Sequence, residues 1–330
     1  MKVKKFLSIL LVALFVFVLA ACGAETTTSE ESTKEEATQE TTEEAAGETD
    51  EVEQKEITIT HELGETTLMT NPEKVVAFDF GVLDSLDSLG VEVAAVPKNL
   101  IPDYLSTYNG EEYENVGSLK EIDYETLSEV APDVIFISGR QADFYEELTE
   151  IAPTIYLEVD TTRYMESFEE NMMTLGEIFT KQDEVETKLA EIKETMEDVK
   201  EAAKDKNALV VLLNEGSLSA YGPGSRYGII HDVMGVPAVD ENIEASTHGQ
   251  SVTFEYILEK DPDYLFVIDR TAAIGGETSA EEALENELIK GTKAYQNDQI
   301  VYLDAAVWYL SGGGLESVDF MINEVATGLE

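Results

Sequence analysis

The segment Glu129-Val-Ala-Pro-Asp-Val-Ile-Phe-Ile-Ser-Gly-Arg140 has a second copy 130 residues later, Glu259-Lys-Asp-Pro-Asp-Tyr-Leu-Phe-Val-Ile-Asp-Arg270. Five of the twelve positions are identical. Each copy predicts the end of a helix, a turn at Pro-Asp, a buried strand and then an arginine. Two ordinary helix–strand units could match by coincidence. The shared arginine nevertheless favours two lobes of like topology.

Short apolar runs alternate with helical stretches through most of the chain. A hairpin pattern around Gly64 comes first. The runs that we expect to be strands lie at 75–80, 134–138, 155–159, 209–213, 265–268 and 300–303. Alternation of strands and helices predicts an α/β fold with mainly parallel sheets.

Residues 162–205 interrupt this alternation, because they are long, rich in Glu and Lys, and free of proline. Phe168, Met172, Leu175 and Phe179 recur at helical spacing, and a second helical pattern starts near 183. We therefore expect two similar α/β lobes joined by one long rigid helix. The predicted boundaries are 57–161 for the N-terminal lobe, 162–182 for the linking helix and 183–330 for the C-terminal lobe.

The first 22 residues have the features of an export signal. Three lysines precede a sixteen-residue, largely apolar run that ends in Leu19-Ala20-Ala21-Cys22. This run is too short to span a membrane as a helix. The sequence around Cys22 is similar to a bacterial lipobox, so we expect residues 1–21 to be a lipoprotein signal peptide and Cys22 to carry lipid. A plain secretory signal is the alternative.

Residues 22–56 are rich in Thr, Ser, Glu and Gln, and we expect an acidic disordered tether there. The whole chain has a formal net charge of −48, which argues against nucleic acid as a partner. Cys22 is the only cysteine, which excludes a disulfide framework and a thiolate metal cluster. The sequence also contains no nucleophile elbow or zinc-protease motif, so we expect no enzyme activity.

The chain has only four arginines, and three of them follow strand-like runs: Arg140, Arg226 and Arg270. Arginine is the preferred partner for planar anions and aromatic faces. Ligands of open α/β sheets bind beyond the C-terminal ends of the strands. Any single arginine could instead form a salt bridge with a neighbouring carboxylate. Together, the three indicate a cleft for an anionic ligand.

Three further residues are candidates for the site. His248 lies in a polar loop, while Trp308 and Tyr309 precede three consecutive glycines that allow close approach of the backbone to a ligand. An aromatic plug in the core is the alternative for this segment. Imidazole can bind iron, and iron(III) favours anionic oxygen donors. One histidine and one tyrosine are too few to hold iron alone, but they could complete the coordination of a chelated iron.

The chain resembles the iron-siderophore-binding lipoproteins of ABC importers, which are class III periplasmic binding proteins, and especially the branch for catecholates such as petrobactin. The resemblance extends from residue 57 onward. Its signposts are residues 57–65, 71–90, 137–140 (Ile-Ser-Gly-Arg), 246–250 (Ser-Thr-His-Gly-Gln) and 307–310 (Val-Trp-Tyr-Leu).

This resemblance implies a lipid-anchored receptor on the extracytoplasmic face of the cell membrane. Arg140, Arg226 and Arg270 would face a ferric catecholate siderophore, and His248 and Tyr309 would ligate its iron when the chelator is tetradentate. Fe(III) would enter only as the siderophore complex, with no intrinsic cofactor. The expected partners are the siderophore, an ABC permease with its ATPase, and the membrane through Cys22. We expect a monomer.

Other functions stay open from the residues alone. A receptor on the same fold could take a hydroxamate siderophore, haem or cobalamin. A receptor for free Mn or Zn needs three or four converging ligands, and the three scattered histidines argue against it. An extracellular enzyme and a purely structural surface protein fit less well. The identity of the siderophore, the docking residues for the permease and the type of cell envelope are not predicted.

Overall fold

The computed structural model describes residues 54–277 and 279–330. The predicted signal peptide, the lipid site at Cys22 and nearly all of the predicted tether lie outside the described residues. Among the residues that are described, no helix is both long enough and apolar enough to cross a membrane.

The first sheet has five parallel strands in the order β5-β4-β3-β6-β7. Their bounds are Val75–Ala77 (β3), Ala95–Val96 (β4), Glu114–Asn115 (β5), Val134–Ile137 (β6) and Thr154–Tyr156 (β7). The connecting helices are α1 (Phe80–Ser88), η1 (Asp103–Asn109), α2 (Tyr124–Val130), η2 (Ala142–Phe144) and α3 (Tyr145–Thr149). The predicted hairpin is formed by β1 (Glu56–His61) and β2 (Gly64–Met69). An all-parallel sheet agrees with the predicted α/β class.

The second sheet also has five strands, in the order β10-β9-β8-β11-β12. Their bounds are Ala208–Asn214 (β8), Ser217–Tyr221 (β9), Gln250–Val252 (β10), Tyr264–Asp269 (β11) and Ile300–Leu303 (β12). β8, β11 and β12 are parallel, whereas β9 and β10 form an antiparallel edge. Its helices are α6 (Ile229–Asp232), α7 (Phe254–Lys260), α8 (Arg270–Ala273), α9 (Ala280–Leu284), α10 (Glu287–Lys290) and α11 (Lys293–Gln296).

The two copies of the sequence repeat occupy equivalent places. The first copy ends α2 and forms β6, and the second ends α7 and forms β11. Both helices end at a left-handed residue, Ala131 with φ 49° and Asp261 with φ 45°. β6 and β11 each lie fourth in the order of their sheets. The prediction of two units of like topology is therefore confirmed.

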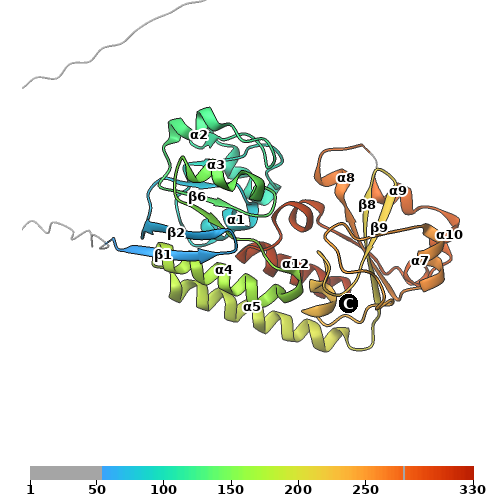
Figure 1. Cartoon of the computed structure of the whole chain (residues 1–330). Coiled ribbons are helices and arrows are strands. Elements are labelled where there is room, and N and C mark those ends of the chain that lie inside the picture. The colour runs from blue at the N-terminus through green and yellow to red at the C-terminus, as the bar shows by residue number, and fades with distance from the viewer. Residues whose placement is uncertain (1–53, 278) are drawn as a thin grey trace, which may run out of the picture. The chain divides into compact units, whose positions relative to one another are not determined.

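The segment between the sheets contains two helices, which correspond to the two helical patterns of the sequence. After η3 (Thr161–Arg163) come α4 (Tyr164–Phe179) and α5 (Gln182–Ala203), and the break falls at Thr180, whose φ is 57°. α4 lies beside α5, and α5 is the helix that continues towards the second sheet (Figure 1). The division of the chain into lobes at 161 and 183 stays a prediction.

One continuous apolar core contains side chains from both sheets and from the helices packed against them. It includes Phe136 on β6, Phe168 on α4, Ile192 on α5, Phe266 on β11 and Val318 on the C-terminal helix, all at most 2% exposed. That last helix, α12 (Leu315–Gly328), packs against α1 and α5. A single-turn π-helix, η4 (Val307–Ser311), leads into it. The core therefore fixes η4 between elements of both sheets.

Candidate functional site

Arg140 and Arg270 follow the C-terminal ends of the parallel strands β6 and β11, whereas Arg226 follows β9, which runs antiparallel to β8. Arg140 is the third residue after β6, and Arg270 directly follows β11 as the first residue of α8. Arg226 lies in the loop after β9, and Tyr309 lies in η4, after β12. The sequence predicted that these side chains meet beyond the C-terminal ends of the strands, and Arg140 and Arg270 occupy such positions.

All three guanidinium groups contact Tyr309. Nη2 of Arg140 and Nη2 of Arg226 donate to its carbonyl oxygen, at 2.6 and 2.7 Å. Nη1 of Arg140 is also 3.5 Å from the carbonyl oxygen of Leu310. Nε of Arg270 donates to the Tyr309 hydroxyl at 2.7 Å. Arg140, Arg226 and Arg270 thus form one arginine cluster around a single tyrosine.

The same guanidinium groups lie close to aromatic rings. The guanidinium carbon of Arg226 is 4.5 Å from the centre of the Tyr309 ring and 5.3 Å from that of Tyr227. The corresponding distances to the Tyr309 ring are 5.3 Å for Arg270 and 5.9 Å for Arg140. Distances within about 6 Å allow cation–π attraction. Arg226 in particular is held between two rings.

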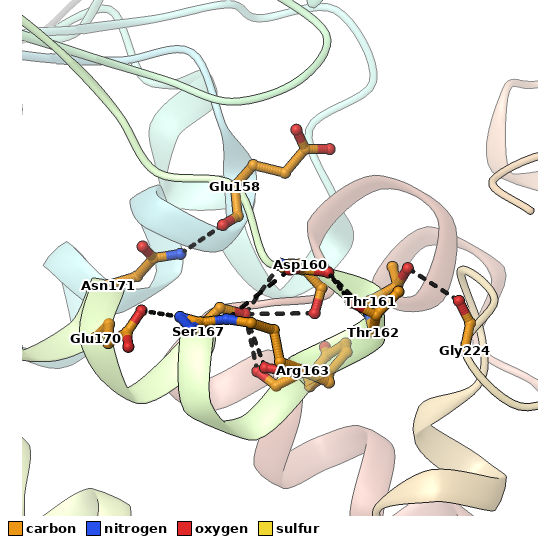
Figure 2. A network of polar contacts seen from close by, with 10 residues as sticks. Glu158, Asp160, Thr161, Thr162, Arg163, Ser167, Glu170, Asn171 and Gly224 are labelled. Carbon is orange, nitrogen blue, oxygen red and sulfur yellow. Dashed lines mark hydrogen bonds and ion pairs between the residues drawn. The ribbon is translucent and has the colours of Figure 1, made fainter. Parts of the chain in front are cut away.

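No carboxylate forms an ion pair with the arginine cluster in the part of the chain that the structure describes. The fourth arginine, Arg163, behaves differently: it pairs with Glu170 and lies 3.8 Å from Asp160, in an exposed network at the start of α4 (Figure 2). The pKa of Arg140 is lowered, first by burial and also by the charge of Arg226, although the negative charge of nearby Asp79 acts in the opposite direction. The cluster is therefore a concentration of unpaired positive charge in a very acidic chain.

The cluster changes the acidity of Tyr309. Partial burial alone would raise the pKa of Tyr309, but the hydrogen bond from Arg270 and the positive charges of Arg270, Arg226 and Arg140 outweigh it. The pKa of Tyr309 therefore lies below its ordinary value. A phenolate is the form of tyrosine that binds a hard cation, so this shift favours a role in metal ligation.

His248 lies in an exposed loop that touches the cluster. The carbonyl oxygen of Ser246 accepts from the backbone N–H of Arg226 at 3.4 Å. Gly249 has φ +69°, and a Cβ there would lie 2.7 Å from Cζ of Tyr221, so the backbone is pressed against that ring. The loop that carries His248 therefore borders the backbone of Arg226 and the ring of Tyr221, and His248 itself forms no hydrogen bond with the cluster or Tyr309 among the described contacts.

Trp308 is buried in the core, where the centre of its ring lies 6.3 Å from that of Tyr227. It is 2% exposed, and its Nε1 donates to Oε2 of Glu324 at 2.7 Å. The glycines that follow it approach helix α1 rather than open space: a Cβ on Gly314 would lie 2.0 Å from Oδ1 of Asp84. The alternative of an aromatic plug thus describes Trp308 well, and the close backbone approach expected for a ligand is made to a helix instead.

Two residues of the site were not predicted. Tyr227, 1% exposed, packs its ring 4.7 Å from that of Tyr221 and under Arg226, and its hydroxyl has no hydrogen-bond partner among the described residues. Asn214 accepts from Nη1 of Arg270 at 2.6 Å. A polar residue closing the apolar run of β8 was the available signal for Asn214, and adjacency to Arg226 was the signal for Tyr227.

A wide cavity lies in a different place, among the described residues. It has a volume of about 1020 Å³, and its wall includes Val307 and Leu310 of η4 but neither Tyr309 nor any residue of the arginine cluster. Its charged lining residues are Asp103, Lys188, Glu191, Asp304, Glu316 and Asp319. The cavity and the positive charge therefore adjoin different residues of η4. We place the candidate site at the arginine cluster, because an anionic chelate needs cationic partners.

Comparisons with known proteins agree with this geometry. The sequence model for periplasmic binding proteins matches residues 75–307. The chain is 47% identical over 333 residues to the petrobactin-binding protein YclQ of Bacillus subtilis, covering 99% of each chain. It is 34% identical over 282 residues to the ferric-anguibactin-binding protein FatB of Vibrio anguillarum, covering 83% of this chain and 88% of FatB.

Solved structures give the same result. The crystal structure of YclQ superposes with a TM-score of 0.82 at 52% identity, covering 84% of this chain and 99% of YclQ. The periplasmic catecholate-siderophore-binding protein VctP of Vibrio cholerae gives 0.79 at 34% identity, covering 83% and 100%. The two-sheet architecture is thus that of solved siderophore-binding proteins.

Proposed function

Because the chain belongs to the periplasmic binding protein family, we propose that it is an extracytoplasmic receptor for a ferric catecholate siderophore. The arginine cluster supports this most directly: three guanidinium groups without carboxylate partners surround one tyrosine. The names of YclQ, FatB and VctP, which refer to siderophores or their ferric complexes, agree with it.

The chemistry of the ligand matches that of the cluster. A ferric catecholate complex is an anion with aromatic faces. Arginine neutralises such an anion, donates to its oxygens and stacks on its rings. A guanidinium has five N–H donors, and Arg226 uses one of them in the side-chain contact to Tyr309. The remaining donors can meet catecholate oxygens, and nothing in this recognition requires a bond in the ligand to break.

We further propose that Tyr309 and His248 ligate the iron of a tetradentate complex. The lowered pKa of Tyr309 favours the phenolate. The exposed loop that carries His248 borders the backbone of Arg226, which supports a place for its imidazole at the edge of the ligand. Together the two side chains would replace two water ligands of the iron.

The wider role includes delivery of the complex to an ABC permease driven by its ATPase, with the protein held at the membrane through lipid on Cys22. These statements are supported by the family and by the lipobox-like sequence. They predict stoichiometric binding without turnover of the siderophore.

Titration of the purified protein tests the ligand class. Ferric petrobactin, ferric enterobactin and a ferric hydroxamate are added in turn, and quenching of protein fluorescence is followed. We expect saturable binding of the catecholates at one equivalent and none of the hydroxamate. Preference for the hydroxamate, or catalytic consumption of the complex, would overturn the proposal.

Replacement of both proposed iron ligands tests direct coordination. The double variant His248→Ala, Tyr309→Phe should weaken a tetradentate ferric complex far more than a hexadentate one, because only the former leaves iron positions open. Equal losses for the two complexes would show that neither side chain binds the metal.

A further inference from the structure

The beginning of α12 is capped by residues of α1, 230 positions earlier in the chain. The backbone N–H of Leu315 donates to Oγ of Ser85 at 3.0 Å. The N–H groups of Glu316 and Ser317 donate to Oδ1 and Oδ2 of Asp84, at 3.3 and 3.0 Å. Both α1 residues are completely buried. The first N–H groups of a helix have no partners within the helix, so here a distant helix supplies them.

The contact extends to the backbone itself. α12 begins after Gly314, which has no side chain with which to cap the helix. A Cβ at Gly314 would lie 2.0 Å from Oδ1 of Asp84 and 2.1 Å from the carbonyl oxygen of Gly81. A Cβ at Gly81 would lie 3.0 Å from the carbonyl oxygen of Ser311. Residues 311–314 therefore cannot shift against α1 without breaking these contacts.

Residues 311–314, which these contacts hold against α1, directly follow the part of η4 that carries Tyr309. Oγ of Ser317 donates to the carbonyl oxygen of Ser311 at 2.8 Å, which closes the end of η4 two residues after Tyr309. The carbonyl oxygen of Tyr309 accepts from Arg140, which follows a strand of the first sheet, as α1 does. Tyr309 is thus fastened to the first sheet's elements at two points, although β12 of the second sheet leads into it.

We propose that Asp84 and Ser85 are positioning residues for Tyr309. By capping α12 from α1, they hold η4 where the Tyr309 carbonyl orients Arg140 and Arg226 and its hydroxyl meets Arg270. Neither residue touches the ligand. The relevance of this clamp to binding depends on the proposed function, whereas its effect on Tyr309 does not.

A ligand-free measurement tests the clamp first. The ionisation of Tyr309 is followed by ultraviolet absorbance against pH, and each variant is compared with its own Tyr309→Phe counterpart to isolate this one phenol. In Asp84→Ala and Ser85→Ala we expect the pKa of Tyr309 to move up towards its ordinary value, because the arginines are no longer aligned with it.

Asp87 is the matched control for this titration. It lies on the same helix and accepts from a tyrosine hydroxyl, that of Tyr108 at 2.9 Å, but it is exposed and makes no bond to α12 in the described contacts. Asp87→Ala should leave the pKa of Tyr309 unchanged. An unchanged pKa in folded Ser85→Ala and Asp84→Ala would overturn the proposal. Should Asp84→Ala fail to fold, Ser85→Ala, which loses a single bond to α12, decides the question.

A double-mutant cycle then tests the consequence for binding. Ser85→Ala and Asp84→Ala should weaken binding of a ferric catecholate, by about tenfold for the aspartate, and should have little further effect in a Tyr309→Phe background. Equal losses in the two backgrounds would indicate a merely structural cap and overturn the proposal. If the parent protein binds no ferric catecholate, the proposed function fails, and the absorbance titration still decides the role of the clamp.

Discussion

The surroundings of η4 shift the pKa values of acidic groups in opposite directions on its two sides. On the side of the arginine cluster, positive charge lowers the pKa of Tyr309. On the side of the large cavity, burial raises the pKa of Asp84 to about 7, and burial with the negative charge of Glu191 raises that of Asp319. The sign of the local field, and not the available volume, therefore distinguishes the side suited to an anion.

The largest expected effect comes from reversing charge within the cluster. Arg226→Glu removes the guanidinium between Tyr309 and Tyr227 and puts an anion in its place. A hydrogen bond to a charged group contributes about 1.5–3 kcal/mol, so the loss together with the new repulsion should weaken ferric catecholate binding at least about 100-fold. Fluorescence titration measures the change in Kd.

Lys188→Glu makes the same charge change on the cavity side and is the control. Solvent and salt screen charges that lie beyond about 8–10 Å, so its effect on Kd should be less than about twofold. Comparable losses of affinity in the two variants would show that the two sides of η4 do not differ in their contribution to ligand binding.

A smaller effect is expected in the pH dependence of stability. The carboxyl of Asp84 has a pKa near 4 in an unfolded chain and about 7 in the folded protein, so the folded state binds its proton more tightly. The stability that Asp84 contributes is therefore greatest near pH 4 and falls as the pH rises to about 7. The neighbouring Tyr104 and Tyr164 have raised pKa values and stay neutral throughout this range.

Asp84→Asn removes this titration. The melting temperature of the parent protein minus that of the variant should decline between pH 4 and 7 in thermal unfolding followed by circular dichroism. A difference that stays constant across this range would show that Asp84 keeps an ordinary pKa.

The smallest effect is expected at Asp319. Asp319→Asn removes one of two neighbouring negative charges on the cavity wall and retains an acceptor for Asn323, which donates to Oδ2 of Asp319 at 3.1 Å. The free energy of unfolding should rise slightly, by no more than about 0.5 kcal/mol, in urea titrations. Ligand affinity should not change. A loss of stability above about 1 kcal/mol would mean that the charge on Asp319 has a favourable partner.

The central strands could be predicted because burial on both faces leaves a continuous apolar run. The runs that form β3, β6, β8 and β11 fit this rule, whereas the other two form the edge strands β7 and β12, and Tyr302 of β12 is 39% exposed. The two-residue strands β4 and β5 are too short to show a recognisable pattern of apolar residues. β9 follows β8 through a tight turn, with positive φ at Glu215 and Gly216, and so reverses direction where a parallel order was expected.

The positions of Arg140 and Arg270 could also be predicted, because a residue after a buried parallel strand has a defined position in an α/β fold, whereas Arg226 follows the antiparallel strand β9. The side chains of η4 could not be assigned from sequence, since neighbouring residues of a π-turn point in different directions. Tyr309 faces the cluster, whereas Trp308 enters the core. Nor does a glycine run reveal whether a ligand or another helix fills the space beside it.

The distant cap on α12 ties the two ends of the folded chain to each other. A polypeptide that emerges N-terminus first presents α1 long before residues 315–317 exist, and until then the carboxylate of Asp84 lacks those amide donors. Contacts of such long sequence separation are slow to form, because the intervening chain must first be ordered. A chain truncated ahead of its last helix would thus retain a buried acid without those partners, and so be an easy target for proteases.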